Sequence, residues 1–181
     1  MEKLKIYSIS DRYITYLEKN CGNVYSNKMS HRTHTRKYIG VVLTIGEFFY
    51  YVPMSSPKKS DYQVAGENLV IKKSIVPIVR MVHKNADKEK QLLGTLRISH
   101  MIPVPKSEIT LYDFEEEADE KYKDLIRNEL KFIRQNEEKI LKNAIVMYKQ
   151  KMENAAIGYV KTALPYRQIE NLCLEFEKEI S

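Results

Sequence analysis

A long stretch without helix-breaking residues constrains this chain most. From Phe114 to Met152 the sequence contains neither proline nor glycine, and its apolar residues recur at helical spacing. Glu137 and Glu138 interrupt the apolar stripe, so the pattern leaves open two helices or one long, partly exposed helix. A last helix is predicted over 165–179, because proline suits a first helical turn. The stripe comprises Tyr122, Ile126, Leu130, Ile133, Ile140, Ala144 and Tyr148.

The residues before this stretch form shorter, alternating runs that are typical of strands. Ser10 is placed to cap a short helix that carries Tyr13. We expect Pro53 to end a strand, because proline cannot donate to a sheet ladder, and segment 101–105 suits an edge or a buried connector. A turn at 46–47 should join two of the strands into a hairpin. The predicted strands are 3–9, 38–45, 48–52, 69–75, 78–82 and 91–98.

Together these patterns predict a single α+β domain over residues 1–181, with an antiparallel sheet and helices packed on it. Residues 1–110 form a basic, sheet-rich body, which has 18 Lys and Arg against 9 Asp and Glu. Residues 111–181 form a helical C-terminal part, which has 12 against 15. This distribution suggests a surface that binds a polyanion, although lysines also simply solubilise a surface.

The sequence indicates a cytoplasmic protein. Its N-terminal residues lack the apolar stretch of a signal peptide, and no apolar run approaches the roughly 20 residues needed to span a bilayer. Cys21 and Cys173 are interpreted as two unrelated thiols, because a reducing cytoplasm disfavours a disulfide between them.

Patterns for metal or cofactor chemistry are missing. Metal-dependent nucleases need converging carboxylates, whereas the nine acids of the basic body are scattered singly. The acids clustered over 115–120 precede a helix and suit its dipole. The sequence also contains no GxxxxGK[ST] loop, GxSxG elbow or HExxH helix. We therefore expect no metal and no cofactor.

Chemistry that side chains perform alone remains open. RNA carries its own nucleophile, the 2′-hydroxyl, so its cleavage needs a base, an acid and groups that stabilise charge on the phosphate. Segments 31–37 and 55–59 are rich in suitable histidine, arginine, lysine, serine and threonine side chains. Neither composition is specific by itself, since such loops are more often solvated connections.

Four short segments follow one another in order over roughly residues 3–105: YSISDRYITYL at 7–17, RKYIGVVL at 36–43, PMSSPK at 53–58 and HMIPV at 100–104. Together they resemble the ToxN/AbiQ family of toxins. The first is similar to the family's opening strand and tyrosine-bearing helix, and the second to its Ile-Gly-Val strand. The third resembles its Pro-x-[ST]-Ser-Pro-Lys motif, and the fourth its Met-Ile-Pro-Val segment. The helical C-terminal part agrees in type, without a shared motif.

The resemblance implies a strongly twisted antiparallel sheet, similar to the MazF/Kid toxin core and surrounded by helices. It implies a metal-independent endoribonuclease toxin of a type III toxin–antitoxin or phage abortive-infection system, which leaves 2′,3′-cyclic phosphate and 5′-hydroxyl ends. The implied partners are substrate RNA and an RNA antitoxin made of pseudoknot repeats. With that antitoxin the toxin would form an oligomeric protein–RNA assembly.

The resemblance also assigns catalytic candidates by position. Ser56 matches the family's key serine, Ser55 the hydroxyl residue before it, and Lys58 the motif lysine. Tyr13 matches the tyrosine of the first helix, and Arg36 a basic residue that is often lysine. On this hypothesis the cations stabilise the phosphorane charge, while the serines donate hydrogen bonds or position the 2′-hydroxyl.

The acid and the base stay open between Tyr13, Lys58, His31 and His34. Where some family members use a tyrosine, in the loop before the Ile-Gly-Val strand, simple offset gives Arg32. An unperturbed histidine titrates near pH 6.5 and would suit the role chemically, although a loop histidine is more often just solvated. His83 and His100 are interpreted as structural.

Recognition of RNA requires cations for the backbone and aromatic rings for unpaired bases. Strand alternation, however, predicts that one of Tyr50 and Tyr51 belongs to the core. The RNA-binding candidates are Lys37, Lys59, Arg32, His34, Tyr50, Lys72 and Lys73.

Two other functions remain possible from the sequence. A non-enzymatic, basic RNA-binding module would explain the charge and the tyrosines, but not the co-occurrence of the four segments. A structural protein whose long helix docks a partner would depend on the apolar stripe and not on Ser56 or Lys58. Cleavage of RNA in EDTA separates the first alternative from the enzyme.

Overall fold

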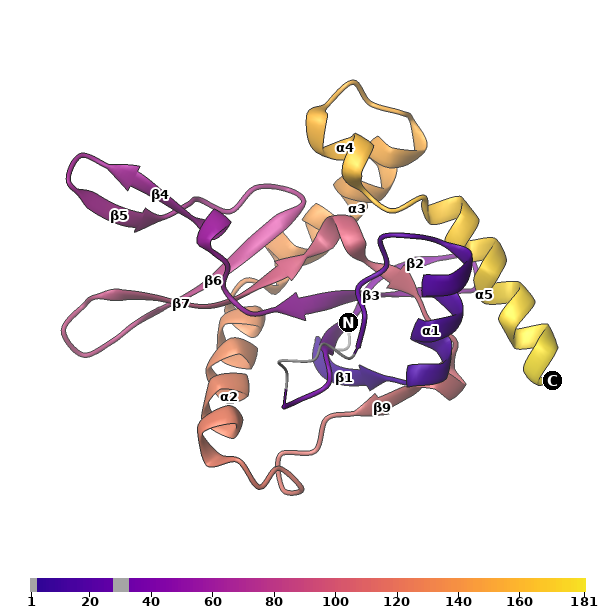
Figure 1. Cartoon of the computed structure of the whole chain (residues 1–181), viewed down its shortest axis with the longest axis horizontal. Helices are drawn as coiled ribbons and strands as arrows, with labels where there is room; N and C mark the ends of the chain where they lie inside the picture. The colour runs from indigo at the N-terminus through magenta and orange to yellow at the C-terminus, as the bar shows by residue number, and fades with distance from the viewer. Residues whose placement is uncertain (1–2, 28–32) are drawn as a thin grey trace.

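The computed structural model describes residues 3–27 and 33–181, and in these ranges it combines helices with antiparallel strands (Figure 1). The strands are β1 (Lys5–Ile9), β2 (Lys37–Ile45), β3 (Phe48–Ser55), β4 (Tyr62–Ala65), β5 (Asn68–Ile71), β6 (Ile78–Lys84), β7 (Lys90–Arg97), β8 (Ile102–Pro103) and β9 (Ile109–Leu111). The helices are α1 (Asp11–Asn20), α2 (Glu120–Gln135), α3 (Glu137–Met152), α4 (Gly158–Thr162) and α5 (Tyr166–Ile180).

One antiparallel sheet carries most of the strands. Its order is β6-β7-β3-β2-β1-β9, and the short β8 also pairs with β3. The hairpin of β4 and β5 forms a separate two-stranded sheet that extends away from the body beside the β6–β7 hairpin (Figure 1). No helix in the described part of the chain is long and apolar enough to cross a membrane.

Helices cover the sheet as the apolar stripe predicts. The stripe forms two helices: α2 ends at Gln135, α3 begins at Glu137, and Asn136 lies between them. Of the stripe, Ile126, Ile133 and Ile140 are all buried. α2 lies against β6 and β7, α3 lies against β2, and α5 runs beside α1 (Figure 1). The predicted N-cap is confirmed, since the Ser10 side chain accepts a hydrogen bond from the backbone of α1.

Strand β3 is longer than its sequence suggests. The prediction that Pro53 ends this strand is wrong, because β3 continues to Ser55. One edge of β3 pairs with β8 at residues 50–51 and with β7 at residues 54–55. Pro53 falls between these two partners, at an interruption of the ladder where a missing N–H is tolerated. The sheet therefore fixes the position of Ser55.

Gly40 in β2 is required by a close approach. A Cβ atom at this position would lie 2.3 Å from Cδ1 of the Tyr51 ring. Tyr51 itself is buried in the hairpin partner β3 and packs edge-on against Tyr7, with ring centroids 5.4 Å apart. The glycine of the Ile-Gly-Val strand is thus explained by the aromatic ring that covers it.

The buried carboxylate of Asp61 holds the segment that leaves β3. Asp61 is 0% exposed, and its Oδ2 accepts a hydrogen bond from the backbone N of Lys58 at 2.9 Å. Arg80 of β6 donates from Nε to Oδ1 at 3.1 Å, and Arg97 of β7 lies 3.5 Å from Oδ2. Because both arginines belong to the sheet, the loop that bears Lys58 is tied to β6 and β7.

We predict that Asp61→Asn lowers the free energy of unfolding by about 3 kcal/mol, because it leaves two buried guanidinium groups without their anion. The matched control is Asp87→Asn, which removes an exposed carboxylate from the β6–β7 turn and should change stability by less than about 0.5 kcal/mol. Urea unfolding followed by circular dichroism measures both variants. Equal stability of the two would contradict the role given to Asp61.

Candidate active site

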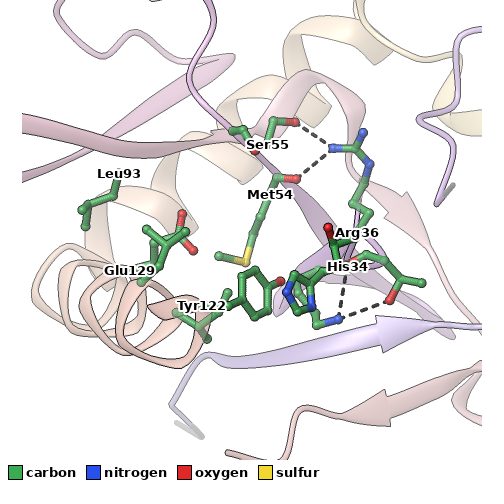
Figure 2. A pocket seen from close by; sticks show the side chains of 13 residues that line it. His34, Arg36, Met54, Ser55, Leu93, Tyr122 and Glu129 are labelled. Carbon is green, nitrogen blue, oxygen red and sulfur yellow. Dashed lines mark hydrogen bonds between the residues drawn. The ribbon is translucent and has the colours of Figure 1, made fainter. Parts of the chain in front are cut away.

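Two chain segments that precede β2 and end β3 come together at one end of this hairpin. Arg36 lies just before β2 and is only 5% exposed. Its Nη1 donates to the carbonyl oxygen of Met54 at 2.9 Å and to Oγ of Ser55 at 2.8 Å (Figure 2). Its Nε donates to the carbonyl oxygen of Ser26 at 3.1 Å. Arg36 therefore joins the loop before β2 to the end of β3 and places a fixed positive charge there.

A cleft of about 1030 Å³ opens beside this arginine. Ser56 and Lys58, both exposed, belong to its wall together with Arg36 and Ser55. An aromatic ring also lines the cleft. The Tyr25 ring centroid lies 4.9 Å from the Arg36 guanidinium and 5.8 Å from Nζ of Lys58. The arrangement combines hydroxyl donors with two cations, as a site for a phosphate group requires.

His100 completes the cleft as a neutral group. Its ring stacks on Tyr25 with centroids 4.4 Å apart, and its Nδ1 lies 2.9 Å from Oγ of Ser99. Burial, followed by the charges of Arg97, Lys58 and Arg36, lowers the His100 pKa to about 4. The imidazole is therefore neutral near pH 7. The same positive field that disfavours its protonation favours a bound phosphate.

A second, smaller hollow of about 250 Å³ lies on the other side of Arg36, Ser55 and Ser56, which line both cavities. Figure 2 shows this hollow, with Glu129 and Tyr122 of α2 on one side and Met54 of β3 on the other. The strand end that carries the two serines thus separates two cavities of different character.

Four of the predicted catalytic residues, Arg36, Ser55, Ser56 and Lys58, meet at this place, but Tyr13 does not. Tyr13 is 0% exposed in the core, and its hydroxyl donates to the carbonyl oxygen of Pro103 at 2.7 Å. Burial, the largest cause, raises the Tyr13 pKa well above its ordinary value. This structure does not bring Tyr13 to the cleft with the other four, because its hydroxyl is directed into the protein.

The RNA-binding predictions divide in the same way. Tyr50 is 0% exposed and donates to Oε1 of Glu170 at 2.7 Å, so this structure does not present its ring to an RNA base. Lys59 and Lys73 are exposed, and Lys72 is partly exposed. The last two line a separate basic hollow with Arg80 and Arg97. The basic hollow has a volume of about 510 Å³.

The loop candidates that the structure describes lie at the smaller hollow. His34 stacks on Tyr122 with centroids 3.7 Å apart, and its Nε2 lies 3.3 Å from Oδ2 of Asp119. Lys37 donates to the Thr35 carbonyl oxygen at 3.3 Å, and its pKa is lowered mainly by burial. Both residues line the smaller hollow. His31 and Arg32 lie outside the described residues.

Sequence reasoning missed several residues of the site. Tyr25 lies in a loop without periodicity, so no pattern distinguishes it from the other tyrosines. His100, interpreted as structural, lines the cleft; its place next to the Met-Ile-Pro-Val segment was the available signal. Glu129 had a clearer signal, because it follows Ile126 by three positions and precedes Ile133 by four on the buried face of α2.

Comparison with known proteins identifies relatives of this chain. The sequence matches the family of the toxin ToxN of the type III toxin–antitoxin system over residues 5–174. It is 32% identical over 137 residues to the endoribonuclease ToxN of Pectobacterium atrosepticum, which covers 76% of this chain and 75% of that protein. It is 26% identical over 176 residues to the endoribonuclease AbiQ of Lactococcus lactis subsp. lactis, covering 97% and 91%.

A solved structure has the same fold. It comes from work on type III toxin–antitoxin systems in which a non-coding RNA pseudoknot selectively inhibits the toxin. The TM-score is 0.76 at 24% sequence identity, over 97% of this chain and 99% of that one. Because the family match covers most of the sequence and the residues of its motifs gather at one cleft, this chain belongs to the ToxN family of type III toxin–antitoxin toxins.

Proposed function

We propose that the chain is a metal-independent endoribonuclease toxin that cuts RNA by attack of the 2′-hydroxyl on the adjacent phosphate. The products are a 2′,3′-cyclic phosphate and a 5′-hydroxyl. The observation that carries the proposal is the meeting of Arg36, Ser55, Ser56 and Lys58 at one cleft, with two cations and two hydroxyl groups around the space for a phosphate.

Each group has a role that its environment supports. The Arg36 guanidinium is buried and held by Met54 and Ser55, so its charge needs no reorganisation when negative charge develops on the phosphorane. Lys58 is exposed above the Tyr25 ring and supplies a second cation that can follow the substrate. Exposed Ser56 donates to a phosphate oxygen or orients the 2′-hydroxyl.

The positions of the candidates for general acid and general base differ in this structure. Of the four candidates, Lys58 lines the cleft and His34 lines the adjoining hollow, which favours these two over the buried Tyr13. His31 lies outside the described residues. His100, with a pKa of about 4, is neutral at the pH of the cell. It can hydrogen-bond a phosphate or a 2′-hydroxyl there, but it adds no positive charge.

The proposed partners are substrate RNA and an RNA antitoxin of pseudoknot repeats, as in the structural relative that a non-coding RNA pseudoknot inhibits. We propose that the chain acts as one domain in the cytoplasm, in phage abortive infection, and forms an oligomeric assembly with its antitoxin. We also propose that its antiparallel sheet is similar in fold to the core of the MazF/Kid toxins.

We predict that Ser56→Ala lowers the rate of RNA cleavage about 10²- to 10³-fold, the usual effect of removing one preorganised donor to a developing oxyanion. The control is Ser107→Ala, which removes an exposed hydroxyl next to β9 and should leave the rate unchanged. The assay uses a mixed RNA substrate in excess EDTA and identifies the product ends. Wild-type protein that binds RNA without cutting it would favour the alternative, a non-enzymatic RNA-binding module.

The basic hollow lined by Lys72 and Lys73 predicts that RNA binding depends on these two lysines. Replacing both lysines with glutamine should weaken RNA binding and reduce the slope of log K against log salt by roughly 0.7 per lysine, because fewer counterions are released. Fluorescence anisotropy with a labelled RNA between low and high salt measures the slope. An unchanged slope would remove these lysines from the RNA path.

A further inference from the structure

The smaller hollow shares Arg36, Ser55 and Ser56 with the basic cleft but adds a group of apolar side chains and one buried carboxyl group. The stacked rings of His34 and Tyr122, nearly parallel at 4°, also line it (Figure 2). At about 250 Å³ it is smaller than the roughly 300–1,000 Å³ of pockets for drug-sized ligands, so it suits a single ring system. The apolar residues that line it are Met54, Leu93, Leu125 and Ile126.

Glu129 is an anomaly in this apolar setting. Its side chain lines the hollow and is 5% exposed, yet within residues 3–27 and 33–181 no hydrogen bond or ion pair engages its carboxyl group. A buried carboxyl group without a partner destabilises the folded state. At the wall of a cavity, such a carboxyl group can form hydrogen bonds with a ligand that occupies the cavity.

Gly94 of β7 makes room for this carboxyl group. A Cβ atom at position 94 would lie 2.5 Å from Oε1 of Glu129 and 2.9 Å from the carbonyl oxygen of Ser55. The absence of a side chain therefore lets the Glu129 carboxyl group lie beside the backbone of Ser55. A molecule that touches Glu129 would consequently be next to a phosphate held by Ser55 and Ser56.

The chemistry of the hollow selects among the parts of an RNA chain. Arg36 and Lys37 supply positive charge at one side of the hollow, where a phosphate held by the serines would lie. At the Glu129 side a phosphate would meet a carboxyl group beside Leu93 and Met54, and a ribose would lose most of its hydrogen bonds with water there. An unpaired base suits both features, because proteins recognise such bases by stacking them on aromatic rings and hydrogen-bonding their edges.

We infer that the hollow is a nucleobase subsite, in which Glu129 hydrogen-bonds the edge of one unpaired base next to the scissile phosphate. The His34–Tyr122 pair offers this base a stacking surface. The inference deepens the proposed endoribonuclease function and rests on it: it names Glu129 as a residue that determines which RNA sequence is cut.

The protonation state of Glu129 agrees with this role. Burial raises its pKa to about 8, so the carboxyl group is mostly protonated at pH 7 and can donate one hydrogen bond while accepting another. A base edge presents such adjacent donors and acceptors. Above pH 8 the carboxylate only accepts, which matches the paired N–H donors of guanine and not the mixed edges of the other bases.

The test uses RNA oligonucleotides with a single cleavage site, in which the nucleotide before or after the cut is intact or abasic. For wild-type protein in EDTA, we expect the abasic change at one of these positions to lower kcat/KM about 10- to 100-fold. Glu129→Leu should lose a similar factor on intact RNA and lose little more on the abasic RNA. Glu129→Gln, which keeps a donor and an acceptor, should retain most of the base dependence at pH 7.

Asp124→Asn is the matched control, because it removes an exposed carboxylate from the same helix. It should cut both RNAs as the wild type does. A loss in Glu129→Leu that is equal on intact and abasic RNA, or a wild type that ignores both abasic positions, would overturn the inference and leave the endoribonuclease function standing.

Absence of cleavage by the wild type would instead overturn the proposed function. The affinities of the same RNAs, measured by fluorescence anisotropy, then decide the inference. An affinity that depends on the base in wild type and not in Glu129→Leu would support it. Affinities that are insensitive to the abasic change would refute it.

Thermal unfolding without RNA gives an independent readout. Because the folded state keeps the Glu129 proton between the carboxyl group's ordinary pKa of about 4.5 and about 8, wild-type stability should fall as the pH rises through this window. Glu129→Leu should remove this contribution and unfold at a higher temperature. A lower unfolding temperature for this variant would show that Glu129 is structural and would overturn the inference.

Discussion

The position of Lys58 in the site depends on a carboxylate that lines neither the cleft nor the smaller hollow. Asp61 is fully buried, and it binds two arginines from neighbouring strands while it accepts a hydrogen bond from the backbone of Lys58. An uncompensated charge in such a place is strongly destabilising, so the three positions must fold together. The segment that follows β3 is thereby held to the sheet, and the lysine it carries is presented to the cleft from a fixed backbone.

Two cations meet at the cleft. Arg36 has its guanidinium bonded to carbonyl and hydroxyl oxygens, and Lys58 lies over the Tyr25 ring. Burial first, and then the charges of Arg97, Lys58 and Arg36, disfavours protonation of His100 and lowers its pKa to about 4. A bound polyanion would relieve this accumulation of positive charge, so the local charge of the cleft bears on the proposed binding of RNA more directly than the net charge of the chain does.

The sequence predicts the elements better than it predicts which side of each element meets the substrate. The β2–β3 hairpin, α1 and the C-terminal helices could be predicted, because the hydrophobic periodicity and the capping residues that specify them lie close together in the sequence. The prediction for Pro53 was wrong because a proline is tolerated where one edge of β3 changes its partner from β8 to β7. That change of partner depends on the tertiary structure and cannot be read from neighbouring residues. Tyr13 and Tyr50 lie away from the cleft for a similar reason: each is buried, and each donates its hydroxyl to an oxygen of the protein.

The close approach of β7 to β3 at Gly94 has a consequence for how this chain can change. A Cβ atom at position 94 would lie 2.5 Å from Oε1 of Glu129 and 2.9 Å from the backbone carbonyl oxygen of Ser55. The carboxyl oxygen ends a flexible side chain and can shift, whereas the carbonyl oxygen belongs to the strand that carries Ser55 and cannot shift without moving it. Position 94 is therefore restricted to glycine by the backbone of β3, and position 129 on α2 can vary while that glycine stays.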